Sequence, residues 1–242
     1  MKKKPKRILC VIVFVFLLIT GSTYFYFSDY YHADETAEKA MKTDYTVKVE
    51  DEKDWIAFVP EKYDTGIILY PGAKVESEAY APLCREFAKD GILAVVVKMP
   101  LHFALLKQNA ADAVREKYDC ADWYMAGHSL GGVAAGNYIA EHTDEYEGII
   151  MLASYTTKDL SKTDLKYFST YGDQDQVLNR KNYEKNMKNI PDDTGYVHII
   201  QGGNHAQFGS YGKQKGDGTA SILPEEQWCE TVAEAEAFMD VR

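Results

Sequence analysis

The stretch Gly127-His128-Ser129-Leu130-Gly131-Gly132 decides the fold of this 242-residue chain. It directly follows the strand-like run 123–126, and its last three residues begin the helix-like run 130–142. In a G-x-S-x-G pattern between a strand and a helix, the glycines allow a sharp turn that presents the serine on a strained bend. The competing interpretation is a glycine-rich turn in which Ser129 only caps a helix. The strand–turn–helix context favours a serine that is presented for chemistry.

On both sides of this turn, strand-like and helix-like runs alternate along the chain. The predicted strands, rich in β-branched and aromatic residues, are residues 45–50, 55–59, 67–70, 92–97, 123–126, 148–152, 166–171 and 196–200. The predicted helices are residues 79–90, 105–117, 130–142, 180–188 and 224–241. This alternation predicts an α/β fold, with a mostly parallel central sheet and helices on both of its faces. Ligands bind at the carboxyl ends of the strands in such sheets.

A serine hydroxyl is a weak nucleophile and needs a base that an acid holds in place. The later part of the chain supplies both residue types, each after a predicted strand. His205 is the candidate base, and Asp175 is the candidate acid, with Asp173 in the same turn as its competitor. Along the chain, Ser129 comes first, Asp175 second and His205 third, which is the order of nucleophile, acid and base that G-x-S-x-G enzymes use.

Four motifs together make the chain resemble the α/β-hydrolase family, and within it the small lidless branch related to dienelactone hydrolases. They are Tyr70-Pro71-Gly72-Ala73, Gly127-His128-Ser129-Leu130-Gly131-Gly132, Gly172-x-x-Asp175 and Gly203-Asn204-His205. They occur in the family's order within about residues 45–240. Four motifs in one order are far more specific than any one of them alone.

The resemblance implies a role for each matching residue. Ser129 would be the nucleophile, His205 the general base and Asp175 the orienting acid. The family's G-x-x-D spacing favours Asp175 over Asp173. The backbone N–H groups of Ala73 and Leu130 would form the oxyanion hole. No metal ion and no organic cofactor is expected.

The segment between two predicted strands limits the kind of site. Only about a dozen residues, 156–165 among them, separate the predicted strand 148–152 from the next one, so no cap domain fits there. We therefore expect a shallow, open site and a small-molecule acyl substrate. The predicted function is a serine hydrolase that cleaves an ester or related acyl bond through an acyl-enzyme. An acyltransferase or peptidase with the same triad, or a non-catalytic binding module of this fold, are the alternatives.

The N-terminal part of the chain has a separate character. Residues 1–7 hold five basic side chains, and residues 8–27 hold no charged one. A helix of that length spans roughly 30 Å, the thickness of a bilayer core. This predicts a cytoplasmic basic tip (1–7), a transmembrane signal-anchor (8–27), a membrane-proximal stalk (28–44) and a hydrolase domain (45–242). The chain would then be a single-pass protein of the cell membrane with an extracytoplasmic domain, or a secreted protein if the segment is cleaved.

Charge and cysteine content limit the partners. The net charge is −10, which argues against a nucleic-acid binder, because such proteins carry a basic surplus. The sequence predicts contact with the membrane through the N-terminal helix, and it indicates no obligatory protein partner. Cys84, Cys120 and Cys229 lie in the predicted domain, where either one disulfide or three free thiols would be compatible with the sequence.

Overall fold

The computed structural model describes residues 4–240. The chain divides into two compact units, residues 1–30 and residues 31–242. In the first unit, α1 (Lys4–Ser28) is one helix. Among the described residues, no helix has both the length and the apolar character that crossing a membrane requires, so the predicted transmembrane segment 8–27 is not supported. The location in the cell membrane stays a prediction from the sequence.

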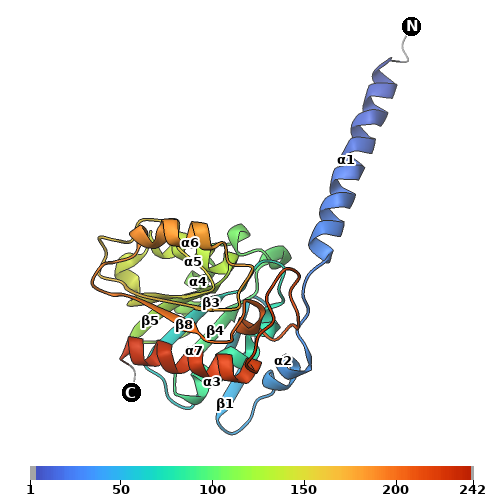
Figure 1. Cartoon of the computed structure of the whole chain (residues 1–242). Helices are drawn as coiled ribbons and strands as arrows, with labels where there is room; N and C mark the ends of the chain where they lie inside the picture. The colour runs from blue at the N-terminus through green and yellow to red at the C-terminus, as the bar shows by residue number, and fades with distance from the viewer. Residues whose placement is uncertain (1–3, 241–242) are drawn as a thin grey trace. The chain divides into compact units, whose positions relative to one another are not determined.

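In the second unit, the described residues form an eight-stranded sheet in the order β1-β2-β4-β3-β5-β6-β7-β8 (Figure 1). The strands are β1 (Val47–Asp51), β2 (Trp55–Pro60), β3 (Thr65–Tyr70), β4 (Leu93–Val97), β5 (Asp122–His128), β6 (Gly148–Leu152), β7 (Lys166–Gly172) and β8 (Gly195–Ile200). β2 pairs antiparallel with β1 and β4, and all the other pairs are parallel. The predicted mostly parallel sheet is confirmed.

The central strands are buried on both faces, which is why they are continuously apolar in the sequence. In β3, Ile67 and Leu69 face one side of the sheet, whereas Ile68 and Tyr70 face the other. All six residues of β3 and all five of β4 are buried. The sheet therefore separates two apolar cores, one under each layer of helices.

Helices cover both faces, as the sequence predicts. The core on one face includes residues of α3 (Ala81–Lys89) and α7 (Pro224–Met239). The core on the other face includes residues of α4 (Ala110–Lys117) and α5 (Leu130–Ile139), and Figure 1 shows α6 (Arg180–Asn186) on that side. The shorter elements are α2 (Glu35–Ala40), η1 (Ser77–Tyr80), η2 (Pro100–His102), η3 (Ala104–Leu106), η4 (Thr143–Glu145), η5 (Met187–Asn189) and η6 (Ala206–Phe208).

Two connections bear on the predicted domain organisation. Only residues 153–165 join β6 to β7, and this described segment holds no inserted domain, in agreement with the predicted absence of a cap. Residues 31–44, which the sequence assigns to a stalk, pack with the domain instead. Tyr31 forms a parallel bridge with Val75, and Ala37 is fully buried. The domain therefore begins at about residue 31 rather than 45, because these residues bury apolar surface on it.

The cysteines of the domain are free. Cys84 is buried, Cys120 is half-buried and Cys229 is exposed, and none of the three is in a disulfide. The bridge that the sequence allows is therefore not formed between them.

Candidate active site

Ser129 lies at the turn from β5 into α5, in the strained backbone conformation that the motif predicts. Its φ is 53° and its ψ is −125°, values that a residue with a side chain rarely adopts. A backbone hydrogen bond ties the turn to the end of β6, since the Ser129 N–H donates to the carbonyl of Leu152 at 3.0 Å. A Cβ on Gly131 would lie 2.2 Å from the carbonyl oxygen of Tyr70. Glycine is therefore required at that position for the elbow to pack against the end of β3.

His205 and Asp175 form a buried pair beyond the carboxyl ends of β8 and β7. The Nδ1–H of His205 donates to Oδ2 of Asp175 at 2.8 Å. The side chain of Asp175 is fully buried and that of His205 is 1% exposed. Because Nδ1 carries the proton that Asp175 accepts, the neutral ring presents a bare lone pair at Nε2. This nitrogen is the one that a general base needs free.

Asp175 remains ionised in this buried position because three donors converge on it. Its Oδ1 accepts the backbone N–H groups of Val177 and Leu178, each at 2.8 Å. Burial works against ionisation, but the hydrogen bonds and charge of His205 and these two N–H groups outweigh it and lower the pKa of Asp175 below its usual value. Asp173 does not face His205; its carboxylate accepts the N–H of Gly202 at 2.7 Å. The geometry therefore favours Asp175 as the partner of His205.

The two predicted oxyanion donors lie on either side of the elbow. Ala73 is in the turn after β3, and Leu130 is the first residue of α5, where backbone N–H groups lack helical acceptors. Among the described residues, neither N–H donates to another protein atom. The helix dipole of α5 adds positive potential at Leu130. Leu130 also lines the cavity that Ser129 and His205 share, whereas Ala73 is not among the residues that line it.

His128 and Tyr80 form a buried contact that the sequence analysis did not identify. The Tyr80 hydroxyl accepts the N–H of Gly72 at 2.8 Å and shares a 2.7 Å hydrogen bond with Nδ1 of His128. The rings of His128 and His205 are 4.6 Å apart. Burial, and then the neighbouring His205, lower the pKa of His128 well below its usual range, so its ring is neutral. The only sequence signal for this contact is the position of His128 inside the motif.

Ser129 and His205 line the same small cavity, of about 190 Å³. Its remaining walls are mostly apolar and come from the α5 start, the β6 end and the loop after Asp175: Leu130, Val133, Ala153, Ser154, Tyr155, Val177, Leu178 and Asn179. Nε2 of His205 is buried and has no hydrogen-bond partner within the described part of the chain. The Ser129–His205 hydrogen bond is therefore not formed in this structure; in enzymes without substrate such bonds are often long.

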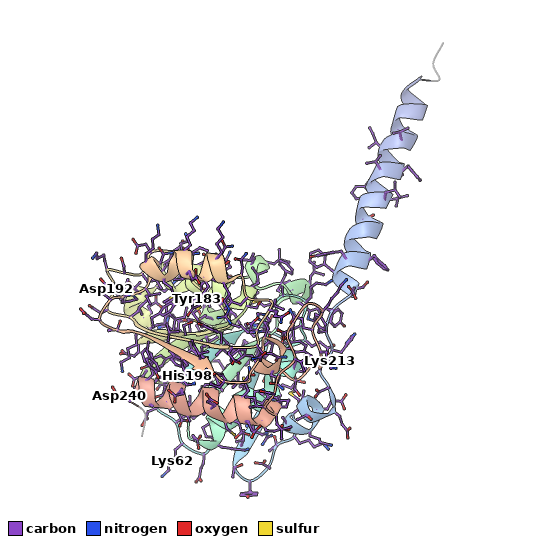
Figure 2. The ribbon with its side chains drawn as sticks, viewed as in Figure 1. Lys62, Tyr183, Asp192, His198, Lys213 and Asp240 are labelled. Atoms are coloured by element: carbon purple, nitrogen blue, oxygen red, sulfur yellow. The ribbon has the colours of Figure 1, made fainter. Side chains whose placement is uncertain are left out.

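Other candidate residues lie elsewhere. Residues 99–106, which follow β4, are not among the residues that line this cavity. His198 lies on β8, where its Nε2 pairs with Glu230 of α7 at 2.7 Å (Figure 2). Among the described residues, no group of three His, Cys, Asp or Glu side chains is arranged to hold a metal ion.

Comparison with known proteins finds a family that matches most of the chain. The model of a family described as "Alpha/beta hydrolase family" matches residues 66–229. TT1662 from Thermus thermophilus is similar in structure, with a TM-score of 0.59, 14% identity, and coverage of 81% of this chain and 99% of that one.

Two further solved structures are similar. A predicted CIB-like hydrolase from Thermoplasma acidophilum has a TM-score of 0.57 and 17% identity, over 79% of this chain and 99% of its own. Est1E from Butyrivibrio proteoclasticus has a TM-score of 0.55 and 17% identity, over 81% of this chain and 99% of its own. At these identities the likeness concerns the fold. No curated protein matches the sequence.

Proposed function

Because the chain belongs to the α/β-hydrolase family, we propose that it is a serine hydrolase that cleaves an ester or related acyl bond of a small molecule. One observation carries the proposal. His205 is joined to Asp175 at 2.8 Å and lines the same cavity as Ser129, which sits on a strained turn. A nucleophile, a base and an orienting acid thus meet at one place.

The proposed reaction begins with acylation of Ser129. Its Oγ attacks the acyl carbon while Nε2 of His205 takes the hydroxyl proton, which gives a tetrahedral intermediate and an imidazolium. Ionised Asp175 stabilises that imidazolium through Nδ1–H. The N–H groups of Ala73 and Leu130 donate hydrogen bonds to the developing oxyanion, an effect commonly worth several kcal/mol of barrier. The C–O bond then breaks, and the proton on Nε2 leaves with the alcohol.

Hydrolysis of the acyl-enzyme repeats these steps with water. His205 takes a proton from the water, the resulting oxygen nucleophile attacks the acyl carbon, and Ser129 leaves with the proton returned by Nε2. The carboxylic acid is released and the triad is restored. Every proton transfer uses one nitrogen of one residue, so no metal ion or cofactor enters the sequence of steps.

The cavity favours a short acyl group. A volume of about 190 Å³ lies below the range of roughly 300–1,000 Å³ that is usual for drug-sized ligands. Val133, Val177 and Leu178 make the wall apolar, which suits an alkyl chain better than a charged one. We expect p-nitrophenyl acetate and butyrate to be cleaved with a higher kcat/KM than the decanoate.

The test is active-site labelling with a fluorophosphonate probe, combined with ester hydrolysis. The probe should label the unaltered chain, and Ser129→Ala should abolish both labelling and turnover. Asp175→Asn should lower kcat by up to about 10⁴-fold, because His205 then adopts the wrong tautomer. Asp173→Asn is the matched control and should have a far smaller effect, since this carboxylate accepts the N–H of Gly202 and the imidazole of His205 bonds Asp175 instead.

Each alternative has its own signature in this experiment. Labelling that persists in Ser129→Ala would refute the assignment of the nucleophile. A folded protein that neither reacts with the probe nor cleaves any ester would be a binding module. Faster product formation with added alcohol or amine acceptors than with water would indicate an acyltransferase, and cleavage of peptides in preference to esters would indicate a peptidase.

A further inference from the structure

The loop from Gly209 to Leu223 lies between η6 and α7 and contacts both loops of the triad. Lys213 marks its exposed part in Figure 2. The mechanism above uses no residue of this loop. Its second half nevertheless returns to the domain, where Asp217 and Gly218 meet the segments that carry Asp175 and His205.

Asp217 accepts hydrogen bonds from the residues that immediately follow the base and the acid. Its Oδ2 accepts the N–H of Ala206, which follows His205, at 2.8 Å. Its Oδ1 accepts the N–H of Gln176, which follows Asp175, at 3.3 Å, and that of Gly218 at 2.8 Å. One carboxylate therefore joins the two catalytic loops directly. Hydrogen bonds to a charged acceptor are about twice as strong as neutral ones.

Close packing fixes this contact on the Asp175 side. A Cβ on Gly218 would lie 1.9 Å from the carbonyl oxygen of Gln174, so only glycine lets the loop approach that turn. The carbonyl of Gly218 in turn accepts the side-chain amide of Asn204 at 2.8 Å. The segment 217–218 is thus bonded to the residues on both sides of His205.

The His205 segment needs such support because it is not part of a strand. β8 ends at Ile200, and the backbone on both sides of His205 takes several of its partners from side chains. The buried amide of Gln227, on α7, accepts the N–H of Asn204 at 3.0 Å and donates to its carbonyl at 2.9 Å. Gln227 therefore holds the residue before His205, while Asp217 holds the residue after it. The two loops are also bonded to each other before His205, where Asp173 accepts the N–H of Gly202 at 2.7 Å and the N–H of Gln174 donates to the carbonyl of Gly203 at 3.0 Å. Of the two side chains that hold the residues next to His205, Asp217 is the one that also bonds the Asp175 loop.

We propose that Asp217 is a positioning residue of the triad, which keeps the Asp175 and His205 loops at the separation that the Nδ1–Oδ2 hydrogen bond requires. This inference rests on the proposed function. Asp217 acts through the two loops and touches neither substrate nor reacting atoms. Losing one of the two loop contacts would let the imidazole tilt. A misplacement of about 1 Å at a catalytic group costs on the order of 10²-fold in rate.

The test compares Asp217→Asn and Asp217→Ala in the full chain. The asparagine keeps the size of the side chain but replaces one acceptor oxygen with a donor group, so it cannot accept from both loops. We expect kcat to fall about 10-fold in Asp217→Asn and up to about 100-fold in Asp217→Ala, with KM changed less than about threefold. The matched control is Asp159→Asn, an exposed aspartate that accepts the N–H of Ser161 in a loop outside the site.

A second measurement does not depend on turnover. The Nδ1 proton that His205 shares with Asp175 gives a far-downfield proton NMR resonance, which should weaken or move upfield in both Asp217 variants and stay unchanged in Asp159→Asn. If the proposed function fails, no variant has activity, yet this resonance still reports the positioning. An unchanged resonance and kcat in Asp217→Asn would overturn the proposal. Loss of the folded state in Asp217→Asn, seen by circular dichroism, would overturn it too, because the role would then be structural only.

Discussion

At the scale of single residues, Tyr80 and His128 support the turn that carries Ala73. Tyr80 is fully buried, and its hydroxyl holds the N–H of Gly72, the residue directly before Ala73. Burial raises the pKa of Tyr80, so the hydroxyl keeps its proton. With neutral His128 bonded to the same oxygen, the peptide before Ala73 has a fixed partner on the core side. The proposed oxyanion hole would thereby be organised before substrate arrives.

Tyr80→Phe should therefore impair catalysis more than binding. The change leaves the N–H of Gly72 buried without a partner, which costs about 1–3 kcal/mol of unfolding free energy. We expect kcat to fall about tenfold with little change in KM, as measured by steady-state ester hydrolysis. Tyr183→Phe is the control, because it removes a buried hydroxyl that is bonded to Ser169 of β7 rather than to the turn after β3. Equal losses of kcat in the two variants would contradict this account.

At the scale of elements, the helix predicted over residues 105–117 is longer than the helix that the structure contains. The sequence predicts one helix, but the structure has η3 followed by α4, which starts at Ala110. The hydroxyl of Tyr70 donates to the carbonyl of Gln108 at 2.5 Å and accepts the N–H of Ala111 at 3.1 Å. A side chain from β3 thus takes the place of helical partners at the start of α4. No local pattern contains that partner.

The contact between α3 and α7 places two carboxylates together. Glu236 of α7 faces Asp90, which ends α3, and burial, followed by the charge of Asp90, raises the pKa of Glu236 to about 7. The folded protein then keeps this proton up to about pH 7, whereas the unfolded chain releases it near pH 4.5. The unfolding free energy should fall as the pH rises from about 4.5 to about 7, and should be constant above that range as far as this group is concerned.

Glu236→Gln should remove that dependence. Because the group is partly solvated, we expect a stabilisation of only about 1 kcal/mol at pH 8 and none at pH 4. Urea unfolding at both pH values measures it, and Glu225→Gln, an exposed change on the same helix, is the control. A stabilisation of the same size at pH 4 and pH 8 would show that the carboxylate pair is not its cause.

At the scale of the whole molecule, residues 31–44 hold parts of the domain that are distant in sequence. The N–H of Tyr31 donates to the carbonyl of Lys74 at 2.7 Å, and Lys74 directly follows Ala73. Asp34 bonds Ser210, in the loop that leads to Asp217. Arg85 of α3 is 8% exposed and donates to the Asp44 carboxylate at 2.7 Å and to the Ala40 carbonyl at 2.8 Å.

Two truncated chains test this boundary. A chain that starts at Tyr31 should unfold in the same range of urea concentration as the full chain, because Tyr31–Arg242 is a compact unit. A chain that starts at Tyr45 should lose about 3 kcal/mol of unfolding free energy, since several buried or charged hydrogen bonds vanish together. Equal stability of the two truncated chains would restore the domain start predicted from the sequence.

The sequence by itself determined the features that neighbouring residues encode. A turn with Gly127 and Gly131 around Ser129 is a property of contiguous backbone, and alternating strand and helix patterns select a parallel sheet. The sequence also shows directly that Ser129, Asp175 and His205 follow one another in this order along the chain.

Only the tertiary structure decided which distant groups meet. It paired Asp175 rather than Asp173 with His205, brought Asp217 to the loops of Asp175 and His205, and bonded Tyr80 to Gly72 in the turn before Ala73. The physical reason is that a side chain reaches only a few ångströms, so its partner depends on how separate loops converge at the end of the sheet. Local composition cannot specify how these loops converge. Their positions are set by the packing of the two cores on either side of the sheet.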